Sequence, residues 1–218
     1  MRTAIYTAIA GNYDTLKDPV SVTPGFDYIC FTDQPLKSKV WQIEPLCCED
    51  RQRAHKQHKI MLTDVEEYDA SIWVDGSIQI RGWLDGVVSR LFACDEIGFC
   101  IHPWRCCLYQ EAEFCLKKEV GQSRLIRSQI ARYKKLNFPP NQGLYCGGVI
   151  VRRHVPSVLG FNFSWWTELL YSSERDQLSL PYVIRQTGIE VGLLTDSSKQ
   201  PIQPYDGNPY FRWSGHRK

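Results

Sequence analysis

No stretch of the sequence is apolar for long enough to cross a bilayer, because polar residues interrupt every hydrophobic run well before about 20 residues. The opening segment carries one basic residue, and its short apolar run meets Asn12 and Asp14 too soon for a signal peptide. Long tracts of proline, glycine or serine are also missing, which argues against extended disorder. These absences predict a cytoplasmic location.

The chain lacks a strong charge of either sign, since 26 Lys and Arg residues oppose 24 Asp and Glu residues and leave a formal net charge of +2. A balance so close to neutral gives no general field that attracts polyanions. Nucleic acid is therefore not the partner that the charge predicts, although a local basic face would permit one.

Cys-x-x-Cys pairs are absent, so the common spacings of zinc ligands and of thioredoxin-like thiols do not occur. The nine cysteines are odd in number, and two pairs are adjacent in sequence, Cys47 with Cys48 and Cys106 with Cys107, which does not suit a disulfide framework. A chain of 218 residues can also build its core without disulfides. We expect reduced thiols, most of them small core residues.

Short apolar runs bounded by turn residues alternate with segments of helical spacing. Strands are predicted at residues 3–10, 28–31, 70–75, 96–101 and 144–151. Helices are predicted at residues 49–68, 83–93, 108–119, 122–137 and 158–171, with a short one at 175–185 that Pro181 breaks. This alternation predicts one α/β domain over residues 1–218, with an open, largely parallel sheet flanked by helices.

Polar residues follow directly after three of the predicted strands. Asn12 and Asp14 follow the first strand, Asp33 the second, and Asp75 ends the third just before Gly76. Ligands bind at the carboxyl ends of parallel strands, so these side chains are predicted to meet there. Asp75 is the first candidate for a metal ligand, because the glycine after it lets phosphate approach the backbone. An ordinary Asp-Gly turn is an equally good interpretation of the local pattern.

The predicted helix at residues 49–68 carries cations in its early turns, where the helix dipole disfavours them. These cations are Arg51, Arg53, Lys56 and Lys59. An anionic ligand would explain them, and a solvated face is the commoner alternative. His55 and His58 share one side of this helix, a spacing that would allow them to chelate a metal. Because no carboxylates lie at matching positions, a solvated pair is predicted instead.

Five segments, in order, carry a resemblance to a known family. They are YTAIAGNYDTLKDP, DYICFTD, SIWVDGSIQI, HPWRCCLYQEA and RDQLSLPYV. From Tyr6 to about Val183, the sequence is similar to the TOD/MUCI-type glycosyltransferase-like family. The resemblance implies a GT-A fold, a nucleotide-sugar donor that is expected to be UDP-linked, and a divalent cation, Mn²⁺ or Mg²⁺. It thereby implies transfer of a sugar to a hydroxyl acceptor such as a glycan or polysaccharide.

The same resemblance implies a donor site. Asp75 corresponds to the first acid of the acid-any-acid metal motif of GT-A enzymes. Ser77 stands where the second acid would be and would add a hydroxyl to the metal site. A single carboxylate makes a weaker metal site, so His216 is expected to complete it; a disordered terminal residue is the alternative. The implied donor-binding residues are Thr7, Ala8, Asp14, Asp33, Lys59, Asp75, Gly76, Ser77 and Lys218.

Asp176 and Gln177 are expected, by the resemblance, to lie near the reacting sugar. Asp176 would orient donor hydroxyls or serve as general base, with a helix cap as the alternative. An acceptor groove is expected at His102, Arg105, Tyr109 and Glu111. Core packing is the default expectation for Trp104, and stacking on a sugar face is the alternative.

Two other functions stay open. The serine at position 77 allows a degenerate, non-catalytic GT-A domain that binds a glycan or a protein partner. The basic helices around residues 124–135 allow a glycosyltransferase that acts on modified nucleic acid.

Overall fold

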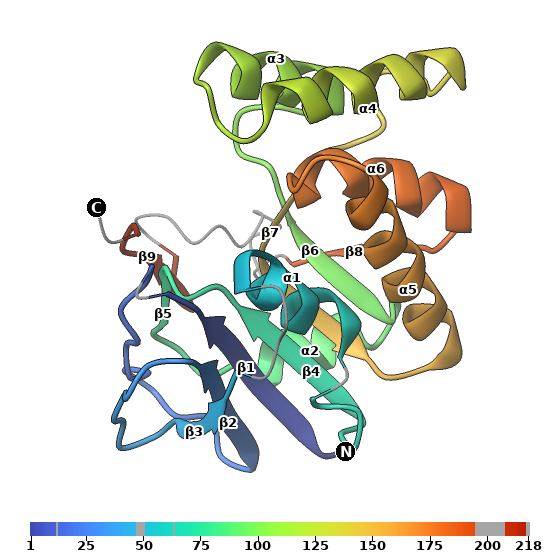
Figure 1. Ribbon diagram of the computed structural model, residues 1–218. Coiled ribbons are helices and arrows are strands. Elements are labelled where there is room, and N and C mark those ends of the chain that lie inside the picture. The colour runs from blue at the N-terminus through green and yellow to red at the C-terminus, as the bar shows by residue number, and fades with distance from the viewer. Residues whose placement is uncertain (12, 47–50, 63, 195–207, 217–218) are drawn as a thin grey trace.

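A computed structural model describes residues 1–11, 13–46, 51–62, 64–194 and 208–216, with the backbone alone at 51 and 52. Within these residues a seven-stranded sheet has the order β3-β2-β1-β4-β7-β6-β8 (Figure 1). Its strands are β1 (Thr3–Ile9), β2 (Phe26–Thr32), β3 (Gln42–Pro45), β4 (Ala70–Val74), β6 (Ile97–Ile101), β7 (Tyr145–Arg153) and β8 (Gly192–Leu193). Only β7 runs antiparallel to its neighbours among these described strands.

The helices cover both faces of the sheet. One face packs against α1 (Arg51–Met61), α5 (Pro156–Tyr171) and α6 (Asp176–Thr187). The other packs against α2 (Asp85–Leu91) and a two-stranded antiparallel sheet of β5 (Ile78–Ile80) and β9 (Phe211–Trp213). A helical hairpin, α3 (Leu108–Lys117) and α4 (Ser123–Lys135), lies beyond α6 at one end of the molecule (Figure 1).

Burial on both faces explains the continuous apolar runs of the central strands. In β1, Tyr6 faces the α1 and α5 side, while Ile5 and Ile9 face the α2 side, and all three are buried. The ring of Tyr6 meets Trp73 of the adjacent β4 edge-on, with centroids 5.3 Å apart. The predicted α/β class with a largely parallel sheet is confirmed.

Several predicted boundaries are wrong. The helix expected to reach residue 68 ends at Met61, because Leu62 has the left-handed φ of 63° that terminates a helix. Pro181 does not break α6, because Leu178, Leu180 and Val183 around it are buried and hold the helix in place. Strands β3, β5, β8 and β9 were not predicted, since two to four residues are too few for a periodic pattern.

The described cysteines are free thiols, as predicted, and four of these seven are buried. Cys47 and Cys48 lie outside the described residues. Among the helices of the described ranges, none is long and apolar enough to cross a membrane.

Stability is expected to fall as the pH drops from about 6.5 to 4, because of His154. Its Nε2 atom lies 2.8 Å from Ser71 Oγ, and burial, together with Arg152, lowers the pKa of His154 to about 4. In the unfolded chain the pKa is about 6.5, so between these values the unfolded state binds a proton that the folded state excludes. The contribution of His154 to the free energy of unfolding is therefore fully present above about pH 6.5 and is lost as the pH falls toward 4.

Urea unfolding of the wild type and of His154→Gln at pH 7 and pH 4.5 measures this effect. We expect His154→Gln to lose about 2 kcal/mol less on acidification, a value reduced for partial exposure of the side chain. Equal losses in the two proteins would show that His154 does not carry the pH dependence.

Candidate active site

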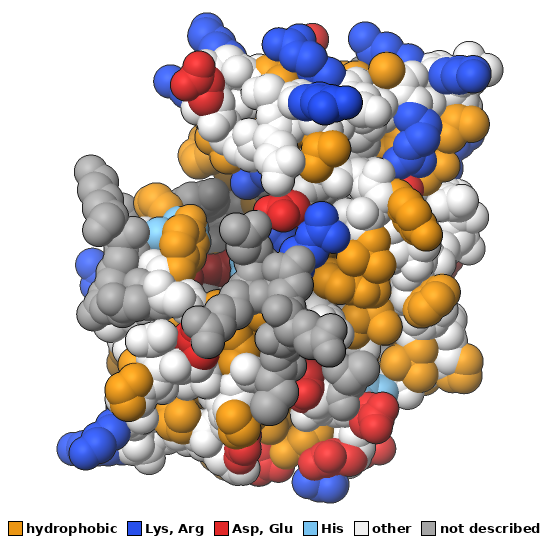
Figure 2. Space-filling view, in the orientation of Figure 1, with side chains coloured by type: hydrophobic (Ala, Val, Ile, Leu, Met, Phe, Trp, Pro, Cys, Tyr) orange, Lys and Arg blue, Asp and Glu red, His pale blue; other side chains and the backbone are white. Residues whose placement is uncertain are grey.

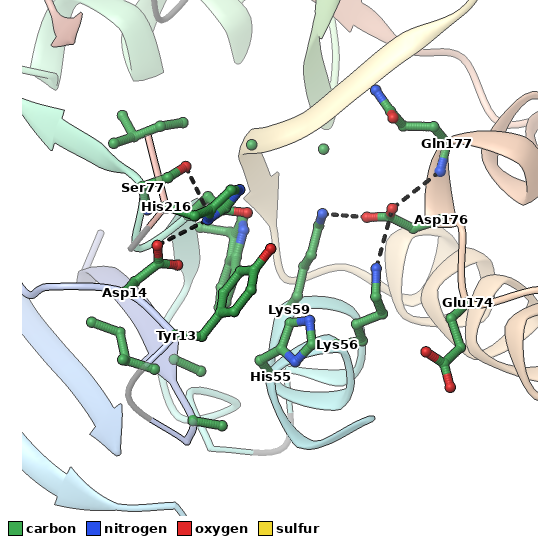
Figure 3. A pocket seen from close by; sticks show the side chains of 18 of the residues that line it. Tyr13, Asp14, His55, Lys56, Lys59, Ser77, Glu174, Asp176, Gln177 and His216 are labelled. Atoms are coloured by element: carbon green, nitrogen blue, oxygen red, sulfur yellow. Dashed lines mark hydrogen bonds and ion pairs between the residues drawn. The ribbon is translucent and has the colours of Figure 1, made fainter. Parts of the chain in front are cut away.

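A pocket of about 770 Å³ opens at the carboxyl ends of β1, β2 and β4 (Figure 3). Because β7 is antiparallel, its amino end, with Gly147 and Gly148, reaches the same edge. The other walls come from α1, from the start of α6, from the α3–α4 turn and from the segment after β9. Four distant parts of the sequence thus converge on the predicted edge of the sheet.

Two carboxylates and an imidazole meet at one side of the pocket and form what we call the acid–histidine cluster: Asp14, Asp75 and His216. One potential ligand atom from each lies within 4.8 Å of the others. His216 Nδ1 is 2.9 Å from Asp14 Oδ1. Burial raises the pKa of Asp14, the hydrogen bond to His216 opposes this rise, and the nearby Asp75 adds to it. A cation here would relieve the repulsion between the two carboxylates.

The turn after β4 fixes Asp75. The Asp75 N–H donates to the Gly148 carbonyl at 2.8 Å, and the Asp75 carbonyl accepts from the Ile78 N–H at 2.8 Å. The Asp-Gly pair therefore does form a turn, and the same turn presents the Asp75 carboxylate to the pocket. At Gly76 a Cβ atom would lie 3.0 Å from Asp14 Oδ2, so glycine lets the Asp14 loop approach closely.

Because β9 pairs with β5, the segment that follows β9 lies beside the pocket and places His216 in its lining. Beyond β9, the Ser214 N–H and hydroxyl both donate to the Ser77 carbonyl, at 2.9 and 2.8 Å. The ring of Tyr13 then lies against the imidazole, with centroids 4.7 Å apart. Backbone contacts thus fix a side chain near the end of the chain next to residues near its beginning.

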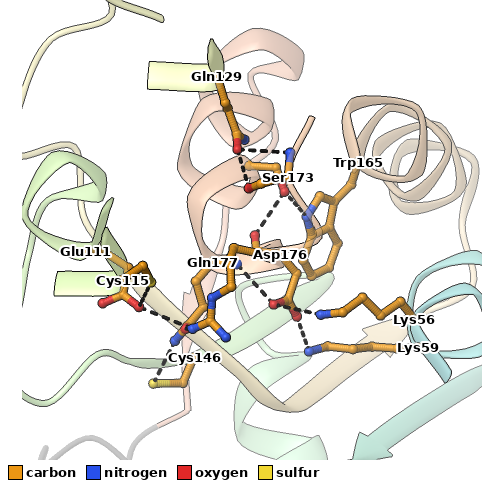
Figure 4. Close-up of polar contacts among 12 residues, drawn as sticks. Lys56, Lys59, Glu111, Cys115, Gln129, Cys146, Trp165, Ser173, Asp176 and Gln177 are labelled. Atoms are coloured by element: carbon orange, nitrogen blue, oxygen red, sulfur yellow. Dashed lines mark hydrogen bonds and ion pairs between the residues drawn. The ribbon is translucent and has the colours of Figure 1, made fainter. Parts of the chain in front are cut away.

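A second group, which we call the lysine cluster, lies on the other side of the pocket: Lys56, Lys59 and Asp176 (Figures 3 and 4). Asp176 Oδ2 accepts from Lys59 Nζ, and Asp176 Oδ1 lies 3.3 Å from Lys56 Nζ. Burial would raise the pKa of Asp176, but Lys56, Lys59 and Arg175 outweigh it and hold the pKa well below its ordinary value. Asp176 is therefore an ionised carboxylate throughout the neutral range.

A buried arginine braces the helix that carries these lysines. The Arg152 guanidinium donates to the Lys59 carbonyl at 2.6 Å and to the Ile60 carbonyl at 3.2 Å. It also donates to Tyr6 Oη at 2.7 Å, and it is fully buried. The Arg152 guanidinium thus holds the backbone of the last turn of α1, which fixes the direction of the Lys59 side chain.

Replacing Gly147 with alanine is expected to disturb the lysine cluster. A Cβ atom there would lie 2.5 Å from Lys59 Nζ and 3.1 Å from Asp176 Oδ2. The buried ammonium has to move, so we expect a loss of about 1–3 kcal/mol of unfolding free energy, which urea denaturation measures. Gly160→Ala is the matched control, because nothing lies within 4 Å of a Cβ at that exposed position. Equal stability of the two variants would contradict this packing argument.

The structure brings most of the predicted donor-site residues together. The pocket is lined by Ala8, Asp14, Asp33, Lys59, Asp75, Ser77, Asp176, Gln177 and His216. Ser77 Oγ donates to Asp75 Oδ1 at 3.1 Å, and Asp33 accepts the Gly11 N–H at 3.0 Å. Thr7 and Gly76 line a second, smaller cavity together with Lys17 and Asp75. Asn12 and Lys218 lie outside the described residues.

The four residues expected to form an acceptor groove are not part of the pocket lining. Glu111 is buried and accepts from Arg105 Nε at 2.5 Å and from Arg175 at 3.4 Å. His102 lies 3.1 Å from the same Arg105 guanidinium, and Tyr109 Oη donates to the Phe138 carbonyl at 2.6 Å. These contacts tie the α3–α4 hairpin to β6 and α6.

Two expectations about single residues are wrong. Trp104 is 70% exposed rather than packed in the core, because its loop turns outward with the Trp104 N–H bonded to His102 Nδ1 at 3.3 Å. His58 is buried and stacks on Phe31 at 4.8 Å, so His55 and His58 are not a solvated pair. His55 lines the pocket, and burial lowers its pKa to about 4, which keeps it neutral at physiological pH.

Sequence reasoning did not assign a binding role to Tyr13 or Arg175, which also line the pocket. Both adjoin residues that were assigned, Tyr13 next to Asp14 and Arg175 next to Asp176. The available signal was therefore proximity in sequence to a candidate acid. A lone aromatic in a polar loop gives no sign of its own.

A mostly parallel sheet with one antiparallel strand, and a pocket lined with acids and lysines at the strand ends, are consistent with an α/β protein of the GT-A class. Residues 38–199, about three quarters of the chain, match the family model described as TOD1/MUCI70, glycosyltransferase-like domain. The chain belongs to this family. No curated protein gives a significant match. Asp75 and Asp176 lie within the matched residues, whereas Asp14 and His216 lie outside them.

Proposed function

We propose that the protein is a metal-dependent glycosyltransferase that moves a sugar from a nucleotide diphosphate, expected to be UDP, to a hydroxyl acceptor. The observation that carries this proposal is the pairing of the acid–histidine cluster with the lysine cluster in one pocket. A leaving diphosphate needs positive charge placed around its oxygens, where negative charge develops. The pocket offers a cation site on one side and two ammonium groups on the other.

The acid–histidine cluster fits a divalent cation. Two carboxylates and one imidazole within 4.8 Å are a donor set that Mn²⁺ accepts readily and Mg²⁺ accepts through its oxygens. When bound, the metal would act as a Lewis acid on the diphosphate oxygens. Asp14 supplies the second carboxylate that the sequence lacks at position 77.

The lysine cluster would bind and orient rather than move a proton. Lys56 and Lys59 place their ammonium groups at the pocket wall, and Asp176 holds both in position. A carboxylate whose pKa is held far below its ordinary value is a weak general base, so we assign Asp176 to orientation of the lysines and of donor hydroxyls. Gln177, the next residue, adds an amide to the same wall.

Calorimetric titration with UDP, in the presence and absence of manganese, tests donor binding, and hydrolysis of a panel of nucleotide sugars tests turnover. We expect binding that requires manganese and slow hydrolysis of one donor. A protein that binds no nucleoside diphosphate with manganese and hydrolyses no donor would overturn the proposal.

The non-catalytic alternative rested on the serine at position 77. Asp14 beside Asp75 weakens that reason, because a second carboxylate is available from another loop. Tight manganese-dependent nucleotide binding without hydrolysis or transfer to any acceptor would favour the alternative.

A further inference from the structure

The α3–α4 hairpin, residues 108–135, concentrates positive charge. It holds seven Lys and Arg residues against three Asp and Glu residues, whereas the whole chain has a net charge of +2. The rest of the chain is therefore net negative. Two of the hairpin's charges are paired within the protein, since buried Glu111 pairs with Arg105 and Arg132 pairs with Glu168. The exposed cations are Lys117, Lys118, Arg124, Arg127, Lys134 and Lys135.

These cations form one surface. Arg124, Arg127, Lys134 and Lys135 recur at helical spacing, which places them within one side of α4. In Figure 2 the Lys and Arg side chains gather over α3 and α4, at the top of the view. None of the six exposed cations pairs with a carboxylate elsewhere in the described chain. The hairpin thus offers six cations against two exposed acids, Glu113 and Glu119.

Apolar side chains are exposed on the same hairpin and on the loop that leads into it. Trp104 is 70% exposed, Leu136 55%, Phe114 39% and Val120 37%. The Arg105 guanidinium lies 4.1 Å from the centroid of the Phe114 ring and supports it from beneath. Exposed aromatic and aliphatic groups among lysines and arginines are typical of surfaces that enter the headgroup region of a bilayer.

We propose that this hairpin docks the protein on a membrane surface that carries anionic lipid headgroups. Each Lys or Arg near such a surface contributes about 1 kcal/mol, and the apolar groups enter the interface. A nucleic acid would satisfy the cations, but it offers nothing to aliphatic Val120 and Leu136. A bilayer with anionic headgroups accounts for both kinds of exposed side chain.

The turn of the α3–α4 hairpin lies next to the pocket. Val120 and Gly121, in the turn between α3 and α4, line the pocket itself. A bilayer in contact with the hairpin would lie next to the pocket entrance, where a hydroxyl carried on a lipid would reach it. This last step rests on the proposed function, whereas the docking does not, because vesicle binding needs no donor.

Co-sedimentation of the whole chain with vesicles tests the docking. We expect binding to vesicles that contain phosphatidylglycerol, little binding to phosphatidylcholine alone, and weaker binding as salt screens the charges. The variant K117E/K118E and the variant R124Q/R127Q should each lower the partition coefficient at least about tenfold, because each cation contributes roughly a factor of five. Trp104→Ala should lower it by roughly fivefold through lost apolar contact.

The matched control for K117E/K118E is K37E/K39E, which makes the same change in charge at exposed positions before β3, far from the hairpin in sequence. It should bind vesicles almost as the wild type does, and all variants should keep the wild-type unfolding midpoint because the residues are exposed. Equal loss in K37E/K39E, equal binding to neutral vesicles, or binding to a DNA duplex but to no vesicle would overturn the proposal. Vesicle binding by a protein that binds no nucleoside diphosphate with manganese and hydrolyses no donor would overturn the enzyme proposal and leave the docking intact.

Discussion

Replacing Asp14 with asparagine is expected to weaken manganese-dependent binding of UDP by at least about 100-fold, as severely as replacing Asp75 does. The reason is geometric, because Asp14, Asp75 and His216 each offer one ligand atom within 4.8 Å of the others. Asparagine keeps the size of the side chain and removes its charge, so the change tests ligation rather than packing. Calorimetry with and without manganese measures the loss for each variant.

Ser77→Ala is the matched control for this prediction. Ser77 occupies the position where the acid-any-acid motif of GT-A enzymes would have its second acid, and its hydroxyl donates to Asp75 Oδ1. If Asp14 is the second carboxylate ligand, Ser77→Ala changes binding by no more than about threefold, the worth of one modest hydrogen bond. Full manganese-dependent binding in Asp14→Asn, with loss in Ser77→Ala, would place the second ligand at position 77 instead.

The edge of the sheet that holds these acids could be predicted, but the metal-ligand role that we propose for Asp14 could not. Buried parallel strands give continuous apolar runs, and β1 pairs directly with β4, so the residues after both strands had to meet. The acid-any-acid motif, however, predicts that the second acid lies at position 77, two residues after Asp75. The approach of Asp14 depends on Gly76, which leaves room for it and shows this only in three dimensions.

His216 was expected at the metal only through the family resemblance. Its place depends on β9, a three-residue strand whose pairing with β5 no periodicity reveals. The contacts of the residues expected to form an acceptor groove could not be predicted from the sequence either. Glu111 faces Arg175, a partner 64 residues away, and a sequence cannot tell such an internal ion pair from a polar groove.

Replacing Asp176 with asparagine is expected to destabilise the protein by about 3–5 kcal/mol and to abolish donor hydrolysis. The carboxylate compensates two ammonium groups, of which Lys59 is buried and Lys56 is mostly so. Removing one partner of a buried pair leaves uncompensated charge, which costs more than the pair itself contributes. Because the pKa of Asp176 is depressed in the folded state, its contribution is fully present above about pH 4 and is lost only as the pH falls further.

Urea denaturation at pH 7 measures the loss of stability. The double variant Asp176→Asn with Lys59→Met separates this loss from the loss of donor hydrolysis. Removing the Lys59 charge as well should restore part of the stability, because an apolar side chain leaves less uncompensated charge in the buried site. Donor hydrolysis should stay absent, since both the carboxylate and one of the ammonium groups are gone from the pocket wall. Asp33→Asn, at an exposed position of the same pocket, controls for loss of negative charge alone and should stay near wild-type stability. Recovery of hydrolysis together with stability in the double variant would mean that Asp176 acts only through folding, and the lysine cluster would then have no role in donor binding.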